Sequence, residues 1–319
     1  MQAMKKILLL GGTGFVGRAL CERLVEHDAA LRLTVATRHL AHAKPVQFLP
    51  TVDPVRCDVH DDAQLTRLVT GHDAVVNLIA ILHGSAAEFD KAHVRLARRL
   101  AGACSAAGVR RLVHVSALGV ATDAPSNYLR SKAEAEAILR AAPLALSVLR
   151  PSVIFGAEDR FLNLFAALQA VFPVMPLAGA DARFQPVWVE DVAAAVVRCL
   201  ERRETIGQTY ECAGPQVFTL RELVQLAGRL SGHQRPVLAL PESMGRLQAM
   251  AMELLPGDPL MSRDNILSMR VPNVATNRLP GLHDLGIDAA ALESVAPSYL
   301  SPGVGVARLN RWRAVRNSG

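Results

Sequence analysis

The sequence predicts an α/β fold: a doubly wound parallel sheet with helices on both faces, followed by a smaller C-terminal α+β lobe. Short apolar runs alternate with stretches of helical spacing through roughly the first half of the chain, a pattern typical of repeated βαβ units. Half of the residues are hydrophobic but only 4% are aromatic. The core must therefore consist mainly of Leu, Val, Ala and Ile, which suits helices packed on a parallel sheet.

The elements of the first half follow in order from the apolar runs and the helical spacing between them. The predicted strands are Lys6–Leu10, Leu33–Thr37, Val55–Asp58, Ala74–Leu78, Arg111–Val115 and Ala145–Leu149. The predicted helices between them are Val16–Glu26, Ala63–Val69, Phe89–Ala107 and Asn127–Ala141. Because each helix joins two strands of the same direction, helices are expected on both faces of the sheet.

The pattern becomes irregular beyond Pro151, where proline and glycine indicate loops and short strands. Helices are predicted at Val192–Arg202, Thr219–Leu230 and Met244–Leu255, and Thr219 with Glu222 forms a capping box at the start of the second of these. These features predict a ligand-binding domain over residues 1–155, a smaller lobe over 156–300 that packs on it with the chain crossing between them, and a basic tail over 301–319.

Charge and cysteine usage narrow the class of protein. The formal net charge is +6, and the 35 basic residues include only five lysines, scattered without a long run, so small anionic ligands explain the balance as well as nucleic acid does. The five cysteines contain no C-x-x-C pair, which predicts reduced thiols and no metal site. No signal peptide is apparent, and the uncharged stretch Phe161–Ala180 predicts a buried helix and a loop rather than a membrane span.

A glycine-rich turn follows the first predicted strand and opens the first helix. Glycines there permit a tight turn and the close approach of a pyrophosphate, and the helix N-terminus supplies N–H groups and a positive dipole. We therefore predict a dinucleotide site in preference to a purely structural turn. Its predicted contacts are Gly11, Thr13, Gly14, Phe15, Val16 and Gly17.

The residue that follows the second strand distinguishes between the two nicotinamide dinucleotides. An acidic residue there would bind the ribose 2′-hydroxyl, but the sequence has Arg38. Since a guanidinium pairs well with a 2′-phosphate, NADP(H) is favoured, while NAD(H) and an ordinary surface arginine remain alternatives. Asp58 and Val59 stand at the end of the third strand, and Asn77 and Ala80 at the end of the fourth. They are further predicted contacts, with plain turn or cap residues as the alternative for Asp58 and Asn77.

A catalytic group is predicted around Tyr128 and Lys132, which are spaced i and i+4 on one helix face. A nearby ammonium stabilises a phenolate and lowers the pKa of a phenol towards neutral pH. Ser116 ends the fifth strand and can hydrogen-bond a carbonyl or hydroxyl group of a substrate. A surface Tyr–Lys pair is the alternative, but the glycine turn favours the catalytic interpretation.

These motifs resemble the extended or atypical short-chain dehydrogenases/reductases and, more narrowly, bacterial relatives of the nucleotide-binding accessory subunit of respiratory complex I. The resemblance implies a Rossmann fold and bound NADP(H), which serves redox chemistry in some members and structure in others, and some relatives are linked to ubiquinone synthesis. It adds Pro151 and Val153 to the predicted cofactor contacts. The matching segments are Gly11–Gly17, Tyr128–Lys132, Arg150–Gly156, Glu158–Asn163, Pro186–Val192 and Met261–Asn265.

The chain departs from this pattern at the helix after the fourth strand. Many members carry a catalytic Asn there, whereas this helix offers His93. His93 is predicted to relay protons or to position the cofactor, with a structural histidine as the alternative. Phe155, Phe161 and Trp188, together with five methionines between Met244 and Met269, either line a pocket for an apolar substrate or form the core of the smaller lobe.

The leading prediction is an NADP(H)-dependent oxidoreductase acting on an apolar carbonyl or quinone-related small molecule. The alternatives are an accessory or assembly factor of complex I or ubiquinone synthesis that holds NADP(H), and a nucleotide-sugar epimerase or dehydratase. A respiratory or quinone-pathway protein is the expected partner, and nucleic acid is not expected. A cytoplasmic location is predicted, with the basic tail either contacting the inner face of a membrane or remaining a solvated end.

Overall fold

The computed structural model describes residues 4–253 and 261–302. The chain divides into two compact units, each assembled from separate segments. The first comprises Met1–Pro151, Val189–Cys212 and Thr276–Asp288, and the second comprises Ser152–Trp188, Ala213–Ala275 and Ala289–Gly319. The chain therefore returns to the first unit twice after leaving it, and the last strand of that unit is contributed by its second segment.

A seven-stranded parallel sheet with the order β11-β6-β5-β4-β1-β2-β3 forms the centre of the first unit. Its strands are β1 (Lys6–Leu10), β2 (Arg32–Thr37), β3 (Val52–Arg56), β4 (Ala74–Asn77), β5 (Arg111–Val115), β6 (Ala145–Pro151) and β11 (Thr209–Cys212). The strand order reverses between β1 and β4. In a sheet of this type ligands bind at the carboxyl ends of the strands beside that reversal, so the fold directs attention to the residues after β1 and β4.

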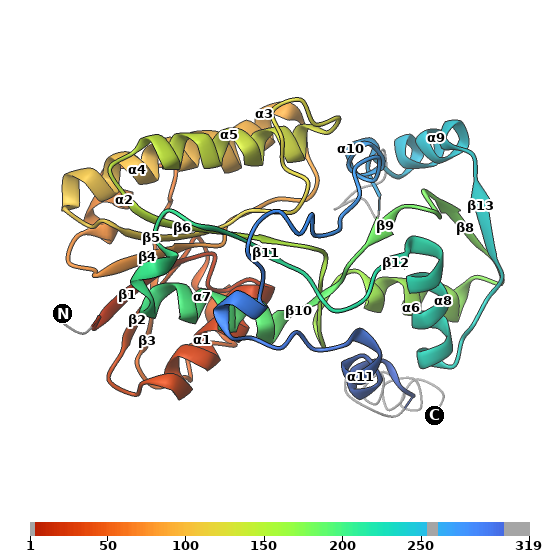
Figure 1. The fold of residues 1–319 in the computed structure, drawn as a ribbon, viewed down its shortest axis with the longest axis horizontal. Helices are drawn as coiled ribbons and strands as arrows, with labels where there is room; N and C mark the ends of the chain where they lie inside the picture. Colours follow the sequence, from red (N-terminus) through yellow and green to blue (C-terminus); the bar gives the residue numbers. More distant parts are fainter. Residues whose placement is uncertain (1–3, 254–260, 303–319) are drawn as a thin grey trace. The chain divides into compact units, whose positions relative to one another are not determined.

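Helices cover both faces of this sheet (Figure 1). On one face α1 (Phe15–His27) packs against α7 (Val189–Glu201), and on the other α4 packs against α2 and α5. The helices of this second face are α2 (Asp62–Val69), α3 (Ala86–Phe89), α4 (Leu96–Ala107) and α5 (Asn127–Ala141). Short 3-10 segments cover Leu40–Ala43, Arg203–Thr205 and His283–Leu285. The observed layers confirm the predicted Rossmann-type α/β class.

Most predicted boundaries differ from the observed ones by one to three residues, and two of the differences have a clear structural reason. The third strand was expected to begin at Val55, after Pro54, but β3 begins at Val52 and includes that proline. A proline is tolerated there because β3 is an edge strand, which needs hydrogen bonds on one side only. The single helix expected over Phe89–Ala107 is interrupted by a π-helical segment, Asp90–Arg95, which periodicity alone does not reveal.

The core beneath α2, α4 and α5 is built from branched and small apolar side chains rather than rings, as the composition indicates. Leu8, Val75, Leu112 and Val148 come from four neighbouring strands, and each is fully buried. Most of the residues that alternate with them along each strand face α1 and α7 and are also apolar. Each strand is therefore a nearly continuous apolar run in the sequence. This packing fixes the carboxyl ends of the strands, where the polar residues stand.

The second unit contains short paired strands and helices. Its strands are β7 (Ile154–Phe155), β8 (Met175–Ala178), β9 (Arg183–Phe184), β10 (Val187–Trp188), β12 (Phe218–Thr219) and β13 (Val237–Leu240). β7 pairs with β10 and β8 with β13, both parallel, whereas β9 and β12 are antiparallel. Its helices are α6 (Leu162–Val171), α8 (Leu220–Ser231), α9 (Glu242–Glu253), α10 (Arg263–Ser268), α11 (Leu292–Val295) and α12 (Pro297–Leu300). The predicted capping box of Thr219 and Glu222 opens α8.

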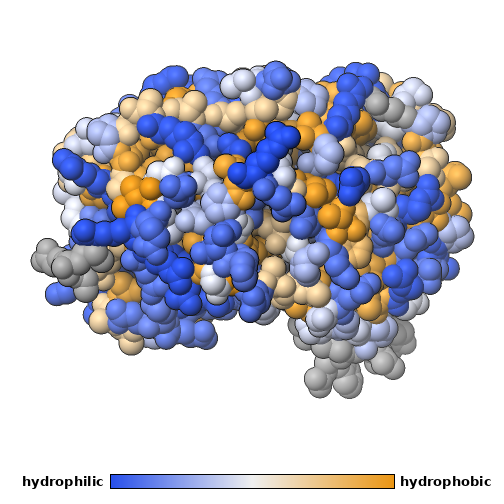
Figure 2. Space-filling model, viewed as in Figure 1, coloured by the Kyte–Doolittle hydropathy of each residue, from blue (hydrophilic) through white to orange (hydrophobic). Residues whose placement is uncertain are grey.

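The uncharged stretch Phe161–Ala180 forms α6 and then β8. None of the helices in the described part of the chain is long and apolar enough to cross a membrane. Hydrophilic side chains cover much of the face shown in Figure 2, with smaller hydrophobic areas between them. Most of the predicted basic tail, from residue 303 onward, lies outside the described residues.

Candidate functional site

A tight glycine turn joins β1 to α1. Gly11 has a φ of +85°, a left-handed conformation that glycine adopts without steric cost. A Cβ atom on Gly17 would lie 2.4 Å from the carbonyl oxygen of Gly11 and 2.5 Å from Cα of Gly12. Backbone atoms cannot move aside as a flexible side chain can, so position 17 accepts only glycine. The turn consequently folds back against the first turn of α1.

The N-terminus of α1 suits an anionic group. The N-cap residue is Gly14, so no side chain caps the helix, and the first helical turn contains no acidic residue. The first N–H groups of a helix lack intrahelical acceptors and lie at the positive end of its dipole. Arg18 stabilises the turn, because its Nη1 donates a hydrogen bond to the carbonyl oxygen of Thr13 at 2.9 Å. These residues fit the pyrophosphate of a dinucleotide, which Gly11–Gly17 would hold.

Three predicted cofactor contacts follow the neighbouring strands β2 and β3. Arg38 comes directly after β2 and its side chain is exposed, so it is accessible to a ligand. Asp58 follows β3, and its Oδ1 accepts the backbone N–H of His60 at 3.0 Å. Val59, which lies between Asp58 and His60 in the sequence, is buried. The Asp58 carboxylate therefore stabilises the turn after β3 through this hydrogen bond. The Arg38 side chain, by contrast, is exposed at the end of β2.

Asn77 ends β4, next to the reversal of strand order. Its Oδ1 accepts the N–H of Ile79 at 3.2 Å, and its Nδ2 lies 3.2 Å from Nδ1 of His114. Both Asn77 and His114 are buried, and burial together with the charge of Lys132 holds the pKa of His114 well below its usual value. Asn77 thus shapes the segment after β4, in which Ala80 is exposed.

Ser116 stands directly after β5 and is buried, with 4% of its surface exposed. Its backbone N–H donates to the carbonyl oxygen of Leu149 on β6 at 2.7 Å, which holds the residue at the carboxyl edge of the sheet. Its Oγ atom has no hydrogen-bond partner among the described residues. A buried hydroxyl without a partner costs free energy, so Ser116 Oγ is free to form a hydrogen bond with a ligand.

Tyr128 and Lys132 lie in the first turns of α5, which Ser126 caps by accepting the N–H of Leu129 at 3.2 Å. Lys132 is buried, and its Nζ donates to the carbonyl oxygen of Val115 at 3.0 Å. Val115 immediately precedes Ser116 in the sequence. The structure therefore brings the helix that carries Tyr128 and Lys132 against the strand end that carries Ser116, as the motif predicts.

Burial controls the acidity of both helix residues. It lowers the pKa of Lys132 to about 8, and the nearby carboxylate of Glu136 opposes this shift. It also raises the pKa of Tyr128 to about 12, whereas the sequence predicts a pKa lowered by Lys132. The difference arises because burial removes the phenolate from water, which disfavours the charged form.

An ion pair lies one helical turn further along α5. Arg150 on β6 donates from Nε to Glu136 Oε1 at 2.9 Å and from Nη2 to Oε2 at 2.7 Å. Such a bidentate pair is among the stronger hydrogen-bonded arrangements. Because Tyr128, Lys132 and Glu136 are spaced four residues apart, they share the inner face of the helix.

His93 lies on the π-helical segment and is 4% exposed. Its ring stands 5.7 Å from the ring of Tyr128, measured between centroids. Nε2 accepts the N–H of Ile81 at 3.2 Å, and Nδ1 lies 2.8 Å from Oγ of Ser131. The structure thus places His93 beside the predicted catalytic helix, with both ring nitrogens engaged.

The remaining predicted site residues belong mainly to the second unit and lie in its interior. The N–H of Val153 donates to Oδ1 of Asn273 at 2.8 Å. Phe155 is fully buried, and Phe161 and Trp188 pack at the edge of the same hydrophobic cluster. Pro151 ends β6 and is buried. These aromatic side chains contribute to a core, while their predicted substrate contacts remain predictions.

Sequence reasoning missed three residues of the site. Arg18 follows the last glycine of the turn, and its contact with Thr13 could be anticipated from that position. His114 stands two residues before Ser116, so strand alternation places both on one face. Ser131 directly precedes Lys132, but only the structure shows that it meets His93.

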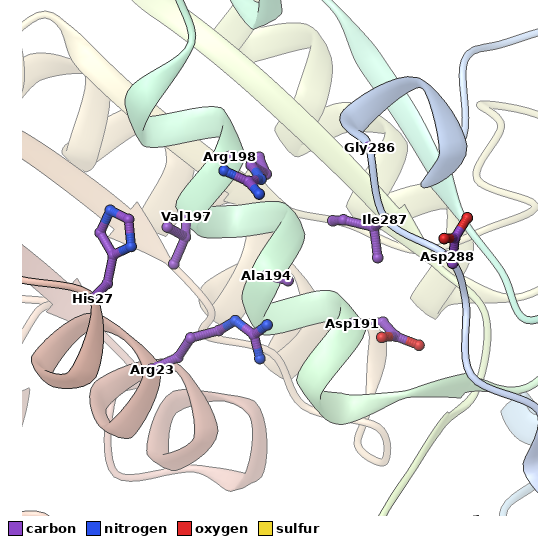
Figure 3. Close-up of a pocket in the computed structure, with 9 residues that line it drawn as sticks. All are labelled: Arg23, His27, Asp191, Ala194, Val197, Arg198, Gly286, Ile287 and Asp288. Atoms are coloured by element: carbon purple, nitrogen blue, oxygen red, sulfur yellow. The ribbon is translucent and has the colours of Figure 1, made fainter. Parts of the chain in front are cut away.

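A pocket of about 310 Å³ lies elsewhere in the first unit, between α1, α7 and the segment Gly286–Asp288 (Figure 3). Arg23 pairs there with Glu190 at 3.3 Å, and His27 and Arg198 each pair with Glu201, at 2.5 and 3.3 Å. Because these basic side chains already have carboxylate partners, the pocket is explained as a polar contact between helices.

Among the described residues, neither a reactive cysteine nor a cluster of metal-ligating side chains is found. All five cysteines are free and buried, and burial raises the thiol pKa of Cys104 and Cys199 to about 11. Such thiols are poor nucleophiles and metal ligands. Within the described ranges, no group of three or more His, Cys, Asp or Glu side chains is arranged to hold a metal ion.

Comparison with known proteins agrees with the glycine turn and the sheet. The sequence profile of a family described as NAD(P)H-binding matches residues 11–203. The chain belongs to this NAD(P)H-binding family. It is 29% identical over 310 residues to NADH dehydrogenase (ubiquinone) 1 alpha subcomplex subunit 9 of Arabidopsis thaliana mitochondria, with 92% of this chain and 76% of that protein covered.

The chain is also similar to a further curated protein and to a solved structure. The chain is 32% identical over 239 residues to the ceramide reductase of Caulobacter vibrioides, covering 74% of each protein. The structure of an NADPH-dependent quinone oxidoreductase of Escherichia coli, solved with NADPH, superimposes with a TM-score of 0.73 at 21% identity, covering 91% of this chain and 98% of that one. At this identity, the structural likeness establishes the fold.

Proposed function

We propose that this NAD(P)H-binding protein is a reductase that transfers a hydride from NADPH to an apolar carbonyl compound. One observation carries the proposal: the buried Oγ of Ser116, which lacks a partner among the described residues, stands at the strand end held by Lys132. In a dinucleotide fold this edge of the sheet is where cofactor and substrate meet. A structural turn would not require an unsatisfied hydroxyl there.

The side chains divide the proton chemistry among them. When bound, NADPH supplies the hydride to the carbonyl carbon. Ser116 Oγ donates a hydrogen bond that orients the carbonyl oxygen, and the Tyr128 hydroxyl gives its proton to that oxygen as negative charge develops. The Lys132 ammonium stabilises the resulting phenolate.

Arg38 supports NADPH in preference to NADH. Its exposed guanidinium follows β2, where the ribose of a dinucleotide lies in this fold. An acidic residue that would repel a 2′-phosphate is absent from the Thr37–His39 segment. A guanidinium and a phosphate form bidentate hydrogen bonds, so the cofactor with the additional phosphate is the better match.

The substrate class is argued from two sources. The aromatic and aliphatic residues of the second unit, including Phe161, Phe184 and Trp188, form an apolar cluster with partly buried members. One relative carries the name ceramide reductase, and a carbonyl compound with long alkyl chains needs apolar contacts from its binding protein. A quinone ring is the second substrate class consistent with such contacts.

A second candidate function is a non-catalytic NADPH-holding accessory subunit. The specific observation in its favour is that Lys132 Nζ is already bonded to the carbonyl oxygen of Val115 while burial raises the Tyr128 pKa. The relative in mitochondrial NADH dehydrogenase is similar over most of the chain. In this case a respiratory complex is the partner, and the protein works at the inner face of a membrane.

Single-turnover reduction distinguishes the two functions. Purified protein is loaded with NADPH and mixed with long-chain 3-oxo amides or with quinones, and nicotinamide absorbance is followed. A reductase loses on the order of 100-fold or more of its rate in Ser116→Ala and Tyr128→Phe, since both contacts act in the transition state. NADPH that stays bound but is oxidised by no compound at any detectable rate identifies the accessory function instead.

A further inference from the structure

We propose that His93 is a positioning residue that couples the segment after β4 to the turn of α5 that carries Tyr128. It does so through two fixed hydrogen bonds, one from the backbone and one to Ser131. The proposal rests on the proposed function in treating Tyr128 as the proton donor, but the hydrogen bonds themselves do not depend on any reaction.

The two hydrogen bonds of the His93 ring determine which of its nitrogen atoms carries the proton. The backbone N–H of Ile81 can only donate, so Nε2 of His93, 3.2 Å away, must accept and carries no hydrogen. The hydroxyl of Ser131 donates its one hydrogen to the carbonyl oxygen of Tyr128 at 2.9 Å. Ser131 Oγ must then accept from Nδ1 of His93 at 2.8 Å. Both ends require the Nδ1–H tautomer.

The imidazole ring is also held by packing. Its centroid lies 5.8 Å from that of Phe89 and 5.7 Å from that of Tyr128, and the two partner rings are 6.0 Å apart. Edge-to-face and tilted contacts at these distances are favourable. His93 therefore stands in a triad of rings, and a ring flip would break both hydrogen bonds.

The π-helical segment explains how His93 reaches this position. Asp90–Arg95 adds a wider turn between α3 and α4. Such π-bulges occur mostly as single turns and frequently lie at functional sites. The segment contacts α5, and His93 is the residue that meets both Ile81 and Ser131. The bulge thus gives one side chain access to two elements.

A proton relay through His93 conflicts with this geometry. A relay residue must accept a proton at one nitrogen and release one at the other, but here each nitrogen is bonded within the protein. Burial and the positive charge of Lys132 lower the pKa of His93 to about 3. The ring therefore stays neutral at neutral pH, and its contribution is to hold other groups in place.

The coupling follows from the two groups that are hydrogen-bonded to the His93 ring, Ile81 and Ser131. Ile81 belongs to the segment after β4, which Asn77 also holds through Ile79, and this segment includes the predicted cofactor contact Ala80. Ser131 holds the carbonyl of Tyr128 itself. A displacement of the cofactor segment is therefore transmitted through one rigid ring to the residue that donates the proton, and both cofactor affinity and turnover depend on His93.

The experiment compares His93→Leu, which removes both hydrogen bonds, with His93→Asn, whose amide can still donate to Ser131 from the position of Nδ1. In His93→Leu we expect the NADPH Kd to rise about fivefold and kcat to fall on the order of 10- to 100-fold. His93→Asn should recover most of kcat but retain the raised Kd, since only the Ser131 contact is restored. His233→Leu, at an exposed histidine, is the control.

Two outcomes of these kinetics would overturn the proposal. If His93→Leu abolishes one limb of the pH profile of kcat while leaving the NADPH Kd unchanged, His93 is a relay. If it only lowers Tm, with kcat and Kd unchanged in the folded protein, the role is purely structural. The expected pH profile keeps its midpoints in both variants.

A spectroscopic readout separates this inference from the proposed function. In protein labelled with ¹⁵N-histidine, NMR should show His93 as the neutral Nδ1–H tautomer with no titration between about pH 5 and 9. If that tautomer and the Kd effect are observed but no compound is reduced, the proposed function fails and the coupling stands. An Nε2–H tautomer, or titration in this range, contradicts the coupling whatever the activity.

Discussion

Lys132 shows at the scale of a single residue how the fold changes ordinary chemistry. The side chain is 1% exposed, and burial lowers its pKa from 10.5 to about 8, while Glu136 opposes the shift. A lysine spaced four residues after a tyrosine can be recognised in a sequence. Its protonation cannot, because it depends on how much water the packing removes and on which carboxylate lies nearby.

The pH dependence of reduction follows from this pKa. Below about 8 Lys132 is the ammonium that the proposed chemistry needs, and above it the ammonium form is lost. We therefore expect kcat to fall as pH rises through about 8. Glu136→Gln removes a carboxylate that favours the ammonium form, so the midpoint should move to lower pH. Stopped-flow measurement from pH 6 to about 10 tests this.

The control for this prediction is Glu134→Gln, which removes an exposed carboxylate from the same helix. Its charge is screened by solvent, and its midpoint should stay within about 0.2 units of the parent value. A midpoint in Glu136→Gln that is unchanged or higher would show that Lys132 does not set the basic limb.

Arg38 is the residue on which the proposed preference for NADPH depends. We expect Arg38→Gln to raise the Kd of NADPH at least about tenfold and to leave the Kd of NADH nearly unchanged, because one charge-assisted pair to the 2′-phosphate is lost. Fluorescence titration of both cofactors measures this. Arg32→Gln, an exposed arginine at the other end of β2, should alter neither affinity, and an equal loss for both cofactors would argue against the assignment.

At the scale of elements, the residues of the proposed site lie where strands meet helices. The β1–α1 turn is predicted from its glycines alone, since few residues other than glycine fit a backbone that folds back so closely. α5 spans Asn127–Ala141, as its helical spacing predicts, and Ser126 caps it. The π-helical segment was not predicted, because an extra residue in one turn leaves almost no mark on the apolar pattern.

The glycine turn provides the prediction at this scale. Gly17→Ala places a Cβ 2.4 Å from the Gly11 oxygen, so the turn must open, and we expect NADPH binding to become undetectable by calorimetry and Tm to fall by several degrees. Gly102→Ala is the matched control. Gly102 lies in α4 with no atom within 4 Å of an added Cβ.

Gly102→Ala should stabilise the protein by about 0.5 to 1 kcal/mol, because alanine has the higher helix propensity, and should bind NADPH normally. Binding by Gly17→Ala with parent affinity would show that the turn does not hold the cofactor.

At the scale of the molecule, the first unit depends on residues distant in the sequence. β11 pairs with β6 as the last strand of the sheet, and α7 buries most of its residues while packing against α1. Both come after the boundary that composition predicts near residue 155. A chain ending there would contain the glycine turn and the serine, tyrosine and lysine, yet leave one face of the sheet partly uncovered.

The fragment of residues 1–155 tests this dependence. Without α7 it exposes the apolar side chains that α7 covers, and we expect aggregation or a broad thermal transition in place of a cooperative one. Circular dichroism during heating, with the full chain measured in parallel, gives the comparison. A soluble fragment with a sharp transition and undiminished NADPH binding would show that residues 1–155 form an autonomous domain.

The amino-acid sequence alone predicts the α/β class, most elements of the sheet half, the glycine turn and the candidate residues Ser116, Tyr128 and Lys132. These are local properties: a period of apolar residues, a backbone that needs glycine, a spacing along one helix. Three other features are visible only in the folded chain: α7 and β11 complete the sheet, Ser116 Oγ is left without a partner among the described residues, and His93 joins Ile81 to Ser131. Burial and contacts between distant residues arise when the chain closes on itself, and no window of sequence contains them.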